Sequence, residues 1–361
     1  MTLLSLIRKK NGNPSGSLDR MAWRRFRRNP LSIASLVVIV LFSLVAILGY
    51  LITPDHTPCC NQQYLELATL KPFSKATFLI TDETGSHTSF LERMVHGEPL
   101  SHTSTPILKY DHARDTLFCI PYNGDPVAVA AKEGRIEERT FILGTDAYGR
   151  DVLSMIMIGS RVSLSVGFIA ILIALLLGIT LGALAAYYGG WVDNLILWII
   201  NVVWSIPTVL LVIAITFVLG KGFWQIFIAV GLTMWVDIAR VVRGEVFSIK
   251  EKEYVEATRA LGYSTFRTIF RHILPNIAGA IVVIAASNFA SAILLEAGLS
   301  FLGIGVQPPM PSWGMMVKEN YGYILLDNAY LAFLPGLAIM LVVLAFMLLA
   351  NGLRDALDIK R

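Results

Sequence analysis

The apolar residues of this chain stand in long blocks, not at the spacing of an amphipathic helix or at alternate strand positions. A helix that crosses a bilayer needs about 20 mostly apolar residues, because lipid leaves backbone amides no partners outside their own segment. Six blocks predict an all-α polytopic membrane protein with six transmembrane helices. They are Leu31–Thr53, Val162–Tyr187, Leu195–Leu219 (which contains Pro207), the short Phe223–Ile238, Ile277–Leu295 and Tyr330–Ala350.

Composition and charge agree with this class and predict an orientation. Of 361 residues, 55% are hydrophobic and 16% are charged. Residues 1–30 hold eight Lys and Arg against one acid, and the loop 240–275 holds seven, whereas the two shorter connections on the opposite face hold only Lys221 and Lys318. Basic residues favour the cytoplasmic side, so both termini and the loop are expected there. The net charge of +4 then reflects topology and attraction to anionic lipid, not nucleic-acid binding.

The segment 54–155 is the one large connection expected outside, between a first span at 31–53 and a five-span core at 156–361. Its runs ATFLI, TLFCI and RTFIL, separated by turn residues such as YNGDP, predict a small mixed α/β insert. It also contains all three cysteines. An oxidising exterior would let Cys119 bridge to Cys59 or Cys60; the alternative is three ordinary buried thiols. No zinc-ligand spacing is present.

A polar island of about thirty residues, Phe247–Asn276, interrupts the apolar blocks. Ser248 and Glu251 form a capping-box pattern that predicts a helix over Ile249–Leu261. Gly262 follows where a helix end favours a left-handed residue, Ser264 can cap a second short helix, and Pro275 marks the next span. The first helix carries one narrow stripe, formed by Tyr254, Ala257, Thr258 and Leu261.

This helical hairpin is too short to be stable alone, so its stripe must pack on other helix ends, the membrane surface or another protein. The small residues Ala257 and Thr258 favour close approach to a protein. A DNA-binding helix-turn-helix is discounted, because spans tether the loop at both ends and it mixes acids with its bases.

The stretch EYVEATRALG followed by RHILPN resembles the EAA loop in the membrane subunits of bacterial binding-protein-dependent ABC importers. Glu256, Ala257, Gly262, Leu274 and Pro275 meet the pattern of that loop. The sequence departs from it at Thr258, where a second alanine is usual, and at His272, where isoleucine is usual. Three further stretches are similar to the DppC/OppC type of dipeptide and oligopeptide permease. They are WRRFRRNPLSIAS, FILGTDAYGRDVLSMIMIGSRVSL and EAGLSFLGIGVQPPMPSWGMM.

The resemblance implies the permease fold of a type I ABC importer in a bacterial inner membrane, working by alternating access. It implies four kinds of partner: a second homologous permease subunit, two ABC ATPase subunits, an extracytoplasmic solute-binding protein and membrane lipid. The implied cargo is a di- or oligopeptide, with nickel or another small solute as the alternative. The implied ATPase-coupling residues are Tyr254, Glu256, Ala257, Thr258, Leu261, Gly262, Leu274 and Pro275.

The sequence itself offers no catalytic site and no metal site. It contains no GxxxxGK(S/T), HExxH or GxSxG pattern, so ATP and Mg are expected on the ATPase partners and no cofactor on this chain. Asp146, Arg150 and Asp151 beside Gly149 form either an ion-paired turn or a solvated face. Glu296, at the outer end of the fifth block, either lines the translocation path and meets a peptide amino group or joins two helices.

Two other classes of function stay open at this point. An ion-driven secondary transporter would need ionisable or broken-helix sites near the midplane and inverted repeats, and neither is evident in the sequence. A membrane-anchored sensor would bind its signal through the segment 54–155.

Overall fold

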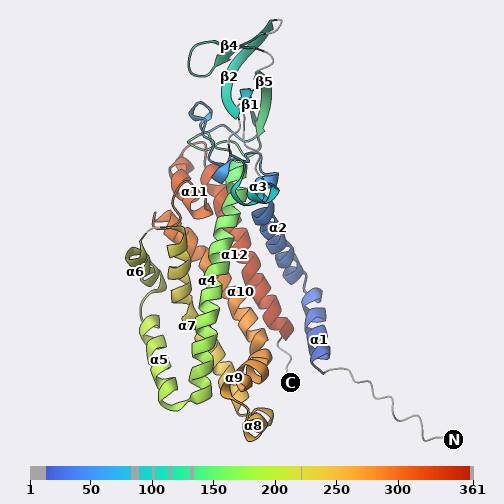
Figure 1. Ribbon diagram of the computed structural model, residues 1–361, viewed down its shortest axis with the longest axis vertical. Helices are drawn as coiled ribbons and strands as arrows, with labels where there is room; N and C mark the ends of the chain where they lie inside the picture. Colours follow the sequence, from blue (N-terminus) through green and yellow to red (C-terminus); the bar gives the residue numbers. More distant parts are fainter. Residues whose placement is uncertain are drawn as a thin grey trace, which may run out of the picture.

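The computed structural model describes residues 14–82, 89–99, 102–113, 116–130, 134–220 and 222–357. Part of the predicted basic segment 1–30 lies outside these ranges, as do Lys221 and the last four residues. The molecule is an elongated helical bundle with a β-sheet at one end (Figure 1). Its α-helices are α1 Pro14–Arg28, α2 Pro30–Ile52, α3 Phe90–His96, α4 Val152–Tyr188, α5 Gly190–Trp204, α6 Thr208–Leu219, α7 Phe223–Lys250, α8 Glu253–Ala260, α9 Thr265–Thr268, α10 Leu274–Phe301, α11 Trp313–Asn320 and α12 Tyr330–Leu357.

Within the described ranges, five helices are long and apolar enough to cross a membrane: Pro30–Ile52, Val152–Tyr188, Phe223–Lys250, Thr265–Phe301 and Tyr330–Leu357. The block predicted as the third span is instead divided between α5 and α6, which meet at an angle of 91°. Pro207 stands at this break as the N-cap of α6, with an extended ψ of 125°. Proline has no amide hydrogen and disfavours helical geometry in the preceding residue, which explains the bend. The sixth span therefore remains a prediction.

Helices α4 and α7 form the centre of the bundle. Gly178 and Gly182 of α4 face Ile238 and Ala239 of α7, and a β-carbon built at Gly182 would lie 2.5 Å from the Ala239 carbonyl oxygen. Small residues thus let the two backbones approach closely, as the GxxxG spacing favours. Helix α10 packs against α12, α7 and α4, and α2 packs against α12 and α4.

The segment between α2 and α4 folds into a five-stranded antiparallel sheet in the order β4-β3-β2-β1-β5. The strands are β1 Ser74–Asp82, β2 His102–Ala113, β3 Thr116–Pro121, β4 Val127–Ala130 and β5 Gly134–Phe141. The three runs that predicted strands lie on β1, β3 and β5, the last extending two residues beyond β5. Phe78 and Ile80 pack on one side with Tyr64 and Leu67, whereas Leu79 packs in a separate cluster with Ile107.

The three cysteines are free thiols, so the structure lacks the predicted disulfide. Cys60 lies in the cluster of Tyr50 and Trp313 at the end of the bundle next to the sheet. Cys119 lies on β3 in the cluster of Leu79 and Ile107 within the sheet. Cys60 and Cys119 thus pack in different hydrophobic cores. Burial also raises the pKa of the Cys60 thiol, which keeps it protonated and unreactive.

Candidate functional site

The polar island lies at the end of the bundle opposite the sheet (Figure 1). The predicted helix start at Ser248 is wrong: α7 runs on to Lys250, and α8 begins only at Glu253 with no side-chain cap. Val246 and Ile249 are buried in the core cluster, so packing extends α7 through the capping-box pattern. The Lys250 ammonium then donates to the Ala186 carbonyl, 2.7 Å away, and joins the end of α7 to the end of α4.

The predicted stripe of α8 is divided between two environments. Thr258 is buried; its hydroxyl donates to the Val255 carbonyl at 2.7 Å and lies 3.3 Å from the Thr268 hydroxyl of α9. Tyr254, Ala257 and Leu261 are exposed, Leu261 to 71%, and Glu256 is exposed as well. The hydroxyl that replaces the usual alanine at position 258 therefore joins the two halves of the hairpin, while the other residues of the stripe are exposed.

Gly262 ends α8 in the left-handed conformation that the sequence predicted, with φ of +73°. Its amide donates to the Arg259 carbonyl at 2.9 Å, and the Tyr263 amide donates to the Thr258 carbonyl at 3.0 Å. These two bonds form a Schellman motif. A β-carbon built at Gly262 meets nothing within 4 Å, so backbone conformation, not space, is what favours glycine there.

The second half of the hairpin continues into the fifth apolar block. Ser264 caps α9 by accepting from the Arg267 amide at 3.4 Å. A π-helical turn, Ile269–Ile273, then connects α9 to α10, so that one helical stretch spans Thr265–Phe301. At the start of α10, Leu274 is partly buried and Pro275 is exposed. Proline lacks an amide hydrogen, but this costs few hydrogen bonds in the first turn of a helix that follows a wider π-turn. Ile269 and Ile273 are buried in the core that contains Ile277.

Glu296 of α10 is fully buried. Its carboxylate accepts from Ser163 of α4 at 3.0 Å and from Ser300 at 2.7 Å. Burying a carboxylate among helices is costly unless it has hydrogen-bond partners, and these serines supply them. The geometry is that of a link between α4 and α10, one of the two roles predicted for this residue.

A buried ion-paired network fixes the start of α4. Arg150 lies 2.6 Å from Asp146 and also 2.6 Å from Glu319 of α11. Burial alone would lower the pKa of Arg150, but the two carboxylates raise it above its ordinary value. Asp151 caps α4 by accepting from the Ser154 amide at 2.9 Å, and burial raises the pKa of Asp151.

The sequence suggested the Asp146–Arg150 turn but not Glu319. Arg150 and Glu319 are 169 positions apart in the sequence. The residues next to Glu319 do not distinguish it from an acid on the protein surface. Likewise, Thr258 alone did not indicate that Thr268 would be its neighbour.

Comparisons with known proteins agree with these features. Residues 178–361 match the family described as binding-protein-dependent transport system inner membrane component, and residues 17–72 match the N-terminal transmembrane domain of oligopeptide transport permease C. The chain belongs to this family of inner-membrane ABC transporter components, so the predicted membership is confirmed. It is an integral membrane subunit of a transporter, not an enzyme.

Two similar proteins are permease subunits whose names give their substrates. The chain is 43% identical to the glutathione transport system permease protein GsiD of Pectobacterium atrosepticum, over 60% of this chain and 72% of that protein. It is 44% identical to the dipeptide transport system permease protein DppC of Alkalihalophilus pseudofirmus, over 60% and 71%. The fold is also similar to a solved inward-facing structure of the MetNI methionine ABC transporter. The match covers 58% of this chain and 98% of the transporter chain, at 20% sequence identity and a TM-score of 0.46.

Proposed function

We propose that this chain is a membrane-spanning permease subunit that carries di- or oligopeptides inward in an ATP-driven importer. Family membership and the dipeptide and glutathione permeases among its relatives support this function. The observation that carries it is the exposed surface of α8 at one end of the bundle. Glu256, Ala257 and Leu261 are exposed there, beside a helix that continues deep into the bundle.

The proposed mechanism is alternating access. Closure of the two ATPase partners on ATP pushes α8, which seats its exposed face in a groove of one ATPase. The Thr258–Thr268 contact and the buried Ile269 and Ile273 pass this motion to α10. Glu296 passes it on to α4 through Ser163. Packed helices of this kind move as units, which suits them to transmit a push over a long distance.

The rest of the assembly is also part of the proposal. A second homologous permease would complete the path, a solute-binding protein would deliver cargo outside, and ATP and Mg would bind only on the ATPases. The termini and α8 would be cytoplasmic and the sheet extracytoplasmic, with α5 and α6 as a broken sixth span. In agreement, α1 with its basic residues and α8 lie toward one end of the bundle and the sheet at the other (Figure 1).

The test compares Gly262→Ala with Gly244→Ala in proteoliposomes that hold the complete transporter. A β-carbon at the left-handed Gly262 should cost about 1 kcal/mol or more and disturb the turn that positions α8. We therefore expect reduced ATP-dependent uptake of a labelled dipeptide and reduced stimulation of ATP hydrolysis. Gly244 has a negative φ inside α7 and open space around it, so Gly244→Ala should behave as wild type.

Each other outcome has a distinct meaning. Unchanged uptake and ATP hydrolysis in Gly262→Ala would exclude the coupling role of the turn. Nickel uptake in place of peptide uptake by the wild type would change the cargo and keep the mechanism. Uptake by this chain alone, driven by an ion gradient, would replace the proposal with a secondary transporter.

A further inference from the structure

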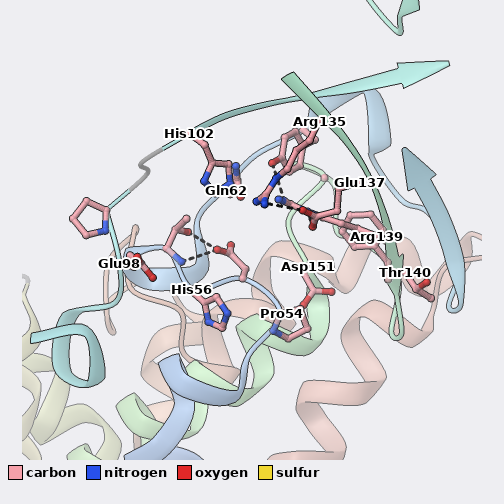
Figure 2. A pocket seen from close by; sticks show the side chains of 16 residues that line it. Pro54, His56, Gln62, Glu98, His102, Arg135, Glu137, Arg139, Thr140 and Asp151 are labelled. Atoms are coloured by element: carbon pink, nitrogen blue, oxygen red, sulfur yellow. Dashed lines mark hydrogen bonds and ion pairs between the residues drawn. The ribbon is translucent and has the colours of Figure 1, made fainter. Parts of the chain in front are cut away.

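A cavity of about 540 Å³ opens where the sheet meets the outer ends of the helices. Its walls come from the segment that follows α2, from β5 and from the residues that precede α4 (Figure 2). This volume is within the range of pockets that hold small molecules. The coupling mechanism proposed above makes no use of this cavity.

The floor of the cavity carries two carboxylates, those of Asp55 and Asp151. Asp55 Oδ1 accepts from the Thr57 amide at 2.8 Å and from its hydroxyl at 2.6 Å. Asp55 Oδ2 is buried and has no hydrogen-bond partner. Asp151 lines the same floor and receives its hydrogen bonds from Ser154. In the part of the chain that the structure describes, no Lys or Arg forms an ion pair with either carboxylate.

The opposite wall carries positive charge in excess. Arg135, Glu137 and Arg139 alternate along β5, so their side chains point to the same face of the strand. Glu137 lies 2.8 Å from Arg139 but 3.9 Å from Arg135, and Arg135 is 66% exposed. The Glu137 carboxylate thus lies near two guanidinium groups. Arg135 therefore still has N–H groups that can donate hydrogen bonds to a ligand. Figure 2 shows these arginines on the β5 side of the cavity, across from Asp151.

The acid at the rim does not change this separation of charge. Glu98 lines the cavity but lies 3.3 Å from Arg93, so its charge is already compensated. Tyr64 and Phe141 add aromatic surface to the lining of the cavity. A metal ion is a poor match, because the described residues contain no group of three side chains able to hold one.

We propose that this cavity binds a short peptide by its two free ends. The α-ammonium group lies toward Asp55 and Asp151, and the α-carboxylate pairs with Arg135 and Arg139. Guanidinium forks bind carboxylates by two parallel hydrogen bonds, which makes the arginine pole selective for that group. The inference rests on the proposed function for its choice of a peptide, and it adds a binding site on this subunit itself, outside the spans.

The test measures binding of L-Ala-L-Ala to the purified full-length chain in nanodiscs, beside its N-acetylated form and its C-terminal amide. Free dipeptide should bind, and blocking either end should weaken binding by about tenfold or more, the equivalent of one charge-assisted hydrogen bond. Arg135→Met should bind the free dipeptide and the amide equally weakly. Asp55→Asn should likewise lose the distinction between the free and the acetylated dipeptide.

Lys75→Met is the matched control, since Lys75 is an exposed cation on the same sheet, paired with Glu138 outside the cavity. It should keep wild-type affinity and selectivity. The inference is overturned if no dipeptide binds, if free and blocked dipeptides bind alike, or if Lys75→Met has the same effect as Arg135→Met. Uptake by the complete transporter separates the two proposals: uptake without binding here leaves the importer intact and removes only this site.

Discussion

Replacing Arg150 with Met is expected to destabilise the chain more than any other single substitution considered for it. Methionine matches much of the arginine stem but removes the guanidinium group that pairs with the buried Asp146 and the partly buried Glu319. Removing one member of a buried ion pair typically costs about 3–5 kcal/mol, because the remaining charge is left uncompensated. We therefore expect a clear loss of folded protein and a melting temperature lower by several degrees. The melting temperature can be measured with a fluorogenic maleimide, which reacts with the buried thiols of Cys60 and Cys119 as the chain unfolds.

Two further variants separate lost charge balance from lost packing. Adding Asp146→Asn and Glu319→Gln to Arg150→Met removes the stranded charges and should restore part of the melting temperature. Lys75→Met breaks an exposed pair and should change stability by less than about 0.5 kcal/mol. Equal melting temperatures for wild type and Arg150→Met would show that the network does not hold α4 to α11.

Replacing Gly182 with Leu should have the second largest effect. A β-carbon there would lie 2.5 Å from the Ala239 carbonyl oxygen and 3.1 Å from the Ala239 α-carbon. Both atoms belong to the backbone of α7, so no side chain can move aside and the helices must separate. Overpacking of a close interface costs about 1–3 kcal/mol and more where backbone must shift.

Melting temperature and yield in mild detergent measure this effect as well. Gly298→Leu provides the matched control, because Gly298 is exposed on α10 and a β-carbon there meets nothing within 4 Å. It should fold as wild type. A Gly182→Leu protein as stable as Gly298→Leu would mean that α4 and α7 are not packed as closely as described.

The features that sequence alone predicted well depend on local physics. Long apolar blocks indicate spans because bilayer thickness sets the required length. The left-handed Gly262 and the cap at Ser264 also follow from residues close to them in the chain. The strand runs of the sheet are of the same kind, since β-branched and aromatic residues favour strands on their own.

The features that it missed depend on distant residues. Ser248 and Glu251 match the sequence pattern of a capping box, yet packing of Val246 and Ile249 continues α7 through it. The sequence left a disulfide and three free thiols open; the cysteines are free thiols, and Cys60 and Cys119 lie in different cores. Arg150 meets its partner Glu319 only because α11 packs near the start of α4. The acidic and basic residues of the cavity come together only because β5 lies near the start of α4. Such contacts have no signature in a single sequence.

The measurement that tests the central claim most directly is affinity purification of this chain from its native membrane, followed by identification of what co-purifies. The wild type and Gly244→Ala should recover a P-loop ATPase. A chain carrying Glu256→Lys and Gly262→Ala should lose it while still folding, because position 256 is exposed and a β-carbon at position 262 meets nothing within 4 Å, so the change disturbs the turn and not the bundle. Recovery of this chain alone, with transport intact, would contradict the account and favour a transporter that works without an ATPase.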